Sequence, residues 1–323
     1  CGGEDIDGCN RTIQELHRFG IGTILDYSVE GSESESDFDA THSEILATIK
    51  RAHGDTAIPF CVFKPTGIGR FALLEKKNSG RDFDAAESAE YDRFVHRLEN
   101  ICSTAHQFGV PVFVDAEESW IQDVIDSLVL EMMRRFNKQK AIVYNTVQLY
   151  RHDRLGYLRN LLESARSSGF KVGVKLVRGA YMEKERLRAK SLGYQSPIQP
   201  DKSATDRDYD LALQLCLQHL DFTSIVAGTH NESSSAQLVD LMKKNGLSPE
   251  HPGIWFSQLY GMSDHISFNL AKAGFNVCKY VPYGPVKAVL PYLIRRAQEN
   301  TSVKGQTGRE LSLIESEMRR RRG

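Results

Sequence analysis

The sequence of 323 residues has no long apolar run and no excess of charge of either sign. No apolar segment reaches the roughly 20 residues that a membrane-spanning helix needs, and no signal peptide is expected. With 41 Lys and Arg against 42 Asp and Glu, the formal net charge is −1, so the bulk charge does not indicate nucleic-acid binding. A basic run at 319–322 is typical of a solvated chain end, and it also permits a weak contact with anionic lipid.

Cysteine and histidine motifs are missing as well. The six cysteines are scattered, and the absence of any C-x-x-C pair excludes a zinc knuckle and a thioredoxin-type motif. Cys61, Cys102, Cys216 and Cys278 lie inside apolar runs, so we expect them to be buried in a protein of a reducing compartment. Neither H-x-H nor H-E-x-x-H occurs, and no metal site is predicted.

What the sequence does contain is one pattern that repeats along its length. A short run rich in β-branched or aromatic residues is followed by polar residues and then by a segment with helical period. Eight strands are predicted in this way, at 21–26, 57–63, 110–114, 141–144, 171–177, 224–227, 254–258 and 277–281. The helices between them include one that opens on a capping-box pattern at 41–44, one at 182–192, one near 206–219, and others near 236–244 and 263–273. Polar loops are expected at 31–39 and 75–84.

Eight strand–helix alternations with short links favour parallel βαβ units, and eight is the number that closes a (β/α)8 TIM-type barrel. An open doubly wound sheet is the alternative. It is disfavoured because no G-x-G-x-x-G follows a strand and no phosphate-binding G-x-x-x-x-G-K-[ST] loop occurs. We therefore predict a single barrel domain over 1–323, with an entering helix within 1–19 and a C-terminal tail at 301–323.

Polar side chains lie at the C-terminal end of every predicted strand, where a barrel of this type carries its active site. These strand ends are Asp26-Tyr27, Lys64-Pro-Thr-Gly67, Asp115-Ala-Glu117, Asn145 with Gln148, Arg178-Gly-Ala-Tyr181, Thr229-His-Asn231, Gln258-Leu-Tyr260 and Lys279-Tyr280. Taken singly, each has an ordinary explanation: Asp115 could cap a helix, His230 could be structural, and Lys64 or Arg178 could pair with Asp115. Their coincidence at all eight ends, with an excess of cations, favours an anionic substrate or cofactor.

A second cationic feature lies near the end of the chain. Arg295, Arg296 and Glu299 share the polar face of a predicted helix that follows the last strand. A solvated surface with intrahelical ion pairs is one interpretation. The other is a clamp for a planar carboxylate, which paired guanidinium groups hold by their fork geometry.

Four motifs in this chain resemble those of the proline dehydrogenase family. They are Phe63-Lys-Pro-Thr66, Lys175-Leu-Val-Arg-Gly-Ala-Tyr181, Thr229-His-Asn231 and Tyr292-Leu-Ile-Arg-Arg-Ala-Gln-Glu-Asn300. They occur in the family's order and the resemblance covers nearly the whole chain. It implies a distorted barrel whose eighth helix lies over the active site, with FAD as cofactor. The implied reaction is oxidation of L-proline to Δ1-pyrroline-5-carboxylate by hydride transfer to flavin N5.

The resemblance also implies partners. Electrons would pass to a membrane quinone, and a separate pyrroline-5-carboxylate dehydrogenase would follow in proline catabolism, because the chain resembles the single-function form. We expect a cytoplasmic protein or one peripheral to an inner membrane, on the matrix side of mitochondria if the source is eukaryotic.

Site residues are implied by the same resemblance. Those that would hold or line the substrate are Arg295, Arg296, Lys64, Tyr280, Asp115 and Leu259. Those that would hold FAD are Arg178, Gly179, Ala180, Tyr181, Gln148, Lys202, Thr205, Thr229, His230, Asn231 and Glu299. Three alternatives stay open: the same chemistry on trans-4-hydroxy-L-proline, a Schiff-base lyase that uses Lys64 or Lys175, and a barrel that binds an amino acid without catalysis.

Overall fold

The computed structural model describes residues 1–27, 33–286, 289 and 318–320. Arg295, Arg296 and Glu299, the predicted eighth helix and most of the predicted tail lie outside the described residues, so the single-domain prediction for 1–323 stays a prediction. Within the described residues, eight parallel strands form a closed barrel in chain order, and β8 pairs with β1. The predicted (β/α)8 architecture is confirmed.

All eight predicted strands exist, with ends that move by a few residues. They are β1 (Ile21–Tyr27), β2 (Phe60–Phe63), β3 (Val112–Val114), β4 (Val143–Gln148), β5 (Val172–Val177), β6 (Thr223–Gly228), β7 (Ile254–Leu259) and β8 (Val277–Tyr283). The largest change is in β4, which continues to Gln148 where the prediction ended it at 144. Its burial on both faces supports that extension, because every residue of β4 is buried.

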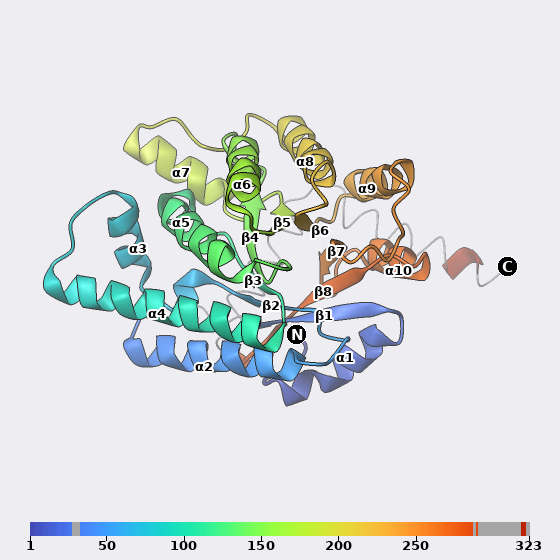
Figure 1. Ribbon diagram of the computed structural model, residues 1–323, viewed down its shortest axis with the longest axis horizontal. Helices are drawn as coiled ribbons and strands as arrows, with labels where there is room; N and C mark the ends of the chain where they lie inside the picture. The colour runs from blue at the N-terminus through green and yellow to red at the C-terminus, as the bar shows by residue number, and fades with distance from the viewer. Residues whose placement is uncertain (28–32, 287–288, 290–317, 321–323) are drawn as a thin grey trace.

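Helices surround the barrel in Figure 1. They are α1 (Asn10–His17), α2 (Glu35–Ala52), α3 (Phe71–Asn78), α4 (Ala85–Phe108), α5 (Ser119–Phe136), α6 (Arg154–Ser168), α7 (Met182–Leu192), α8 (Lys202–Leu217), α9 (Glu232–Lys244) and α10 (Asp264–Lys272), with short 3-10 turns η1 (Asp7–Cys9) and η2 (Pro65–Gly67). The predicted helix at 182–192 is α7. None of the described helices combines the length and the apolar character needed to cross a membrane.

The predicted start of the first helix after β1 is wrong. Helix α2 begins at Glu35, and its cap is Ser34, whose hydroxyl accepts a hydrogen bond of 3.2 Å from the backbone N–H of Asp37. Thr41, predicted as the cap, is a buried residue inside the helix. Ser34 and Asp37 form a cap pattern of their own, and Thr41 is buried within α2 instead of capping it. Helix α2 occupies 35–39 of the loop expected at 31–39, and α3 occupies 75–78 of the loop expected at 75–84.

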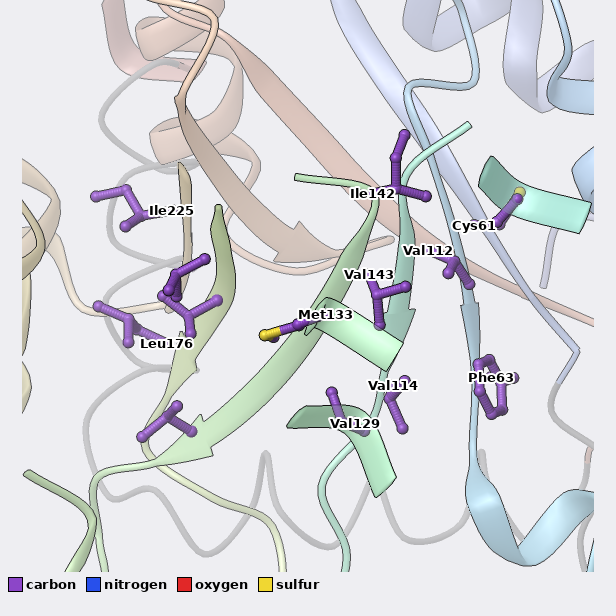
Figure 2. Close-up of a cluster of buried hydrophobic side chains, with 14 of the residues drawn as sticks. Cys61, Phe63, Val112, Val114, Val129, Met133, Ile142, Val143, Leu176 and Ile225 are labelled. Carbon is purple, nitrogen blue, oxygen red and sulfur yellow. The ribbon is translucent and has the colours of Figure 1, made fainter. Parts of the chain in front are cut away.

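Two apolar layers fill the structure. Inside the barrel, alternate strand residues such as Phe60, Val62 and Phe113 form one cluster with Tyr144 and Tyr280. The residues between them face outward and pack on the helices. Figure 2 shows part of this outer layer, with Cys61, Phe63, Val112 and Val114 of the strands and Val129 and Met133 of α5 among its labelled residues. The four cysteines expected to be buried are buried and free, and Cys9 is buried too.

Candidate functional site

The parallel, closed barrel brings all eight C-terminal strand ends to one mouth. Lys64 follows β2, Asp115 follows β3 and Arg178 follows β5, while Gln148 and Leu259 are the last residues of β4 and β7. Tyr280 lies within β8 with its side chain in the interior cluster. The structure thus gathers the described residues of both predicted sets at the end of the barrel where active sites of this fold lie.

A buried lysine ties the predicted substrate residues together. Lys175 of β5 donates hydrogen bonds to the carboxylate of Asp115 and to the hydroxyl of Tyr280, and that hydroxyl lies 3.4 Å from Asp115 Oδ1. Lys175 Nζ also lies 4.5 Å from the centre of the Tyr280 ring. Only 5% of Lys175 is exposed, and burial lowers the pKa of its ammonium group against the opposing effect of Asp115.

Sequence reasoning did not place Lys175 among the substrate residues, although a signal was present. The apolar residues Val172, Val174 and Leu176 alternate with Gly173 and Lys175 along β5. Side chains on one face of a strand recur with period two, and the apolar set packs outward on the helices, so Lys175 faces the barrel interior. A cation at an inward position of a barrel strand needs a buried partner, and Asp115 supplies it.

The other cations at the mouth have partners of their own. Lys64 Nζ lies 3.6 Å from Asp26 Oδ1 at the end of β1. Arg178 Nε donates to Asp206 at 2.7 Å, and its two terminal nitrogens donate to Thr229 Oγ1 at 2.8 Å and Ser234 Oγ at 3.0 Å. Its guanidinium plane also lies 4.4 Å from the ring centre of Tyr209. The sequence suggested Lys64 or Arg178 as the partner of Asp115, but the cation that pairs with it in the described residues is Lys175.

Several residues predicted to hold FAD cluster around Arg178. Lys202, the first residue of α8, pairs with Asp206, which also accepts from Arg178. Lys202 is 70% exposed, so its charge faces solvent at the mouth. Two cations therefore share Asp206, and Ser234 links Arg178 to a second acid, Asp210, to which its hydroxyl donates at 2.7 Å.

His230, Asn231 and Thr205 each have a local structural role. The Asn231 side chain caps α9 by accepting from Ser234 N–H at 3.0 Å. His230 Nδ1 lies 3.0 Å from Ser263 Oγ, and Ser263 is the one residue other than glycine with positive φ in the part of the chain that the structure describes. Thr205 Oγ1 donates to the backbone carbonyl of Asp201 at 3.3 Å. The first two contacts hold the loop after β6 to the starts of α9 and α10, and the third lies within the first turn of α8.

In the segment Gly179–Ala180–Tyr181, the glycine is required by its backbone conformation and by the space around it. Gly179 has φ +135°, and a Cβ atom there would lie 2.5 Å from the ring of Tyr150. No other residue type fits both the backbone conformation and the space. Ala180 is exposed beside it, and Tyr181 precedes α7, so this piece of backbone is accessible at the mouth.

Glu117, which has a buried carboxylate, links three strand ends. Both of its oxygens accept from Thr66, and its backbone carbonyl accepts from Gln148 Nε2 at 2.7 Å. Burial raises the pKa of Glu117 to about 7, although the Thr66 hydrogen bonds and Lys64 act in the opposite direction. Among the described residues, no group of three or more His, Cys, Asp or Glu is placed to hold a metal ion.

Comparisons with known proteins agree on one family. A profile of the proline dehydrogenase family matches residues 9–309. The carbapenem antibiotics biosynthesis protein CarD of Pectobacterium carotovorum is 37% identical over 99% of this chain and 83% of its own length. Human mitochondrial proline dehydrogenase 1 is 41% identical over 74% of this chain, and the hydroxyproline dehydrogenase of Xenopus laevis is 40% identical over 77%.

Coverage of the relatives is uneven. This chain spans 40% of the human protein and 55% of the Xenopus protein. Among solved structures, proline utilization A from Bdellovibrio bacteriovorus superposes on 94% of this chain with a TM-score of 0.83 and 21% identity, and 32% of that longer chain is covered. The likeness at that identity shows a shared barrel fold.

Proposed function

The chain belongs to the proline dehydrogenase family, and from this membership we propose that it oxidises L-proline to Δ1-pyrroline-5-carboxylate with FAD as hydride acceptor. The observation that carries the proposal is the family match over residues 9–309, on a barrel whose strand ends hold three of the four motifs that resemble the family's. Electrons would then pass to a membrane quinone, and a pyrroline-5-carboxylate dehydrogenase would use the product.

The residues at the mouth of the barrel suit FAD in charge and in accessible backbone. A dinucleotide carries a diphosphate, for which Lys202 supplies positive charge, and the backbone at Ala180 is accessible. Arg178 would lie close to the isoalloxazine, where positive charge favours the reduced anionic flavin. Gly179, Ala180, Tyr181, Gln148, Thr205, Thr229, His230, Asn231 and Glu299 are the other proposed contacts, of which Glu299 lies outside the described residues. When bound, the flavin would supply the redox chemistry, and the protein would orient it and tune its charge.

The chain's own residues would bind and orient the amino acid. Lys64, with Arg295 and Arg296 outside the described residues, would hold the substrate carboxylate. Asp115, Leu259 and Tyr280 would line the ring. The hydrogen bond from Lys175 fixes the hydroxyl end of Tyr280, so its aromatic ring has one orientation against the substrate. A ring held in one orientation would help to keep the substrate in position for the reaction, as fixed geometry does in intramolecular reactions.

Colour is the first test of this proposal. We expect the purified protein to be yellow and to lose its colour when L-proline is added without oxygen, because a reduced flavin does not absorb in the visible range as the oxidised form does. Absorption spectra before and after proline measure this, with D-proline as the matched control. A colourless protein that FAD does not reconstitute would contradict the proposal.

The same experiment separates the alternatives of other classes. A Schiff-base lyase would be colourless, and borohydride with substrate would trap it covalently at Lys64 or Lys175. Lys175 suits that role in burial and lowered pKa, but its hydrogen bonds to Asp115 and Tyr280 occupy the ammonium group. A barrel that only binds amino acids would bind proline and leave the flavin oxidised.

Substrate choice is the open point inside the family, since a hydroxyproline dehydrogenase is about as similar as the proline dehydrogenases. We propose that Tyr280 lies over C4 of the substrate ring, where it leaves no room for a hydroxyl group. Proline should then exceed trans-4-hydroxy-L-proline in kcat/KM by about 10²-fold or more, because a clash discriminates more strongly than a missing methylene.

Substitution of Tyr280 should change that ratio. Tyr280→Ser removes the ring and should reduce the preference, mainly through lost efficiency on proline. Tyr280→Phe keeps the ring and should retain the preference, which makes it the matched control. Steady-state kinetics on both substrates measure the ratio. If hydroxyproline is the better substrate of the wild type, or if Tyr280→Ser leaves the ratio unchanged, Tyr280 does not contact the substrate.

A further inference from the structure

The turn that carries Lys64 is anchored at one point to a buried carboxylate. Thr66, two residues after Lys64, donates to Glu117 twice: its backbone N–H lies 2.8 Å from Oε1 and its hydroxyl 2.6 Å from Oε2. Glu117 is only 4% exposed, in the segment between β3 and α5. Burial of a carboxylate to this degree costs free energy unless hydrogen bonds compensate for the lost water, so the native fold requires both bonds from Thr66.

The anchored turn is short and internally bonded. Lys64 directly precedes η2, and its backbone carbonyl accepts a hydrogen bond of 2.9 Å from Gly67 N–H. Pro65 restricts the backbone between Lys64 and Thr66. A shift of Thr66 therefore moves Lys64 with it. The Lys64 side chain starts from this turn and reaches the mouth, where Nζ lies 3.6 Å from Asp26.

The backbone of Glu117 makes a separate contact. Its carbonyl oxygen accepts from Gln148 Nε2 at 2.7 Å, and its N–H donates to Gln122 Oε1 at 2.8 Å. These bonds do not involve the carboxylate, so a side-chain substitution leaves their donors and acceptors in place. The side chain of Glu117 acts on the Lys64 turn, and its backbone acts on Gln148.

We propose that Glu117 is a positioning residue: its buried carboxylate fixes the turn at 64–67 and thereby places Lys64 for the carboxylate of the amino acid substrate. This inference rests on the proposed function, because it takes Lys64 to be a substrate contact. It adds a residue that touches neither substrate nor cofactor and acts through Thr66. Removal of the anchor should weaken substrate binding and leave the cofactor in place.

Thr66 offers a matched pair of variants. Thr66→Val keeps the shape and removes the hydroxyl that Glu117 accepts from, whereas Thr66→Ser keeps the hydroxyl. We expect Thr66→Val to raise the KM for L-proline about tenfold with kcat within about twofold, the scale of one lost hydrogen bond to a charged group. Thr66→Ser should stay within about twofold of the wild type in both constants.

Glu117→Gln tests the other partner. Its KM for proline should rise by roughly three- to tenfold, because the amide keeps one acceptor for Thr66 and loses the other. The flavin dissociation constant, measured by fluorescence titration of the apoprotein, should stay within about twofold, since the backbone bond to Gln148 remains. A merely structural role would lower thermal stability without separating KM from kcat or proline from flavin.

A readout independent of turnover separates this inference from the proposed function. L-Tetrahydro-2-furoic acid keeps the five-membered ring and the carboxylate but has an ether oxygen in place of the amine, so it can bind without being oxidised. Calorimetric titration should show about tenfold weaker binding to Thr66→Val than to the wild type. If the wild type binds the acid and oxidises proline, and Thr66→Val binds the acid as tightly as the wild type, this inference alone is overturned. A wild type that does neither overturns the proposed function and this inference with it.

Discussion

Lys175→Met is expected to lower the free energy of unfolding by about 3–5 kcal/mol, the scale of breaking a buried ion pair by removing one partner. Asp115, whose side chain is 16% exposed, would keep its negative charge. Among the described residues Lys175 is the cation that pairs with it, so the variant would leave that charge without its partner. The Tyr280 hydroxyl would lose a donor at the same time. Urea denaturation of the apoprotein measures the change without any dependence on bound ligands.

Two further variants make that measurement decisive. Lys171→Met is the control, because Lys171 lies just before the same strand and its Nζ donates to the carbonyl of Asp221 near the surface. This variant should change the free energy of unfolding by no more than about 0.5 kcal/mol. Lys175→Met combined with Asp115→Leu removes both charges, and it should recover much of the lost stability. If Lys175→Met is as stable as Lys171→Met, the buried pair does not exist in solution.

Arg295→Met and Arg296→Met are each expected to weaken the binding of L-proline by about 2–4 kcal/mol, which corresponds to about 30- to 1000-fold in the dissociation constant. Both residues lie outside the described residues, so the prediction rests on the motif at 292–300 and on the fork geometry of arginine. Titration with L-tetrahydro-2-furoic acid measures the carboxylate contact directly. Arg159→Met, at an exposed position of α6, is the control and should bind like the wild type.

The flavin content distinguishes the two proposed roles of that motif. Arg295→Met should retain its flavin better than Glu299→Ala does, because the arginine is assigned to the substrate and the glutamate to the cofactor. Visible absorption of the purified variants measures this. Should both arginine variants keep a KM near that of the wild type, the segment is the solvated surface that its charge pattern also permits.

The eight strands could be predicted from the sequence because each has its own apolar run with flanking polar residues. That pattern is local, and so is the placement of Lys64, Asp115 and Arg178 just after their strands. Errors occurred where two local signals compete. Ser34 and Thr41 both resemble helix caps, and the burial of Thr41 against the barrel decides between them. Gln148 likewise belongs to β4 because both faces of that strand are covered.

The long-range pairing of charges at the mouth was decided by tertiary structure alone. Lys175 meets Asp115 at 60 residues of separation and Tyr280 at 105, and Glu117 meets Thr66 at 51. The sequence placed cations and acids at the strand ends, but charge does not indicate which cation faces which acid. Closure of the barrel sets the inward positions of β3, β5 and β8 opposite one another, and desolvation there makes each buried charge take the partner within reach.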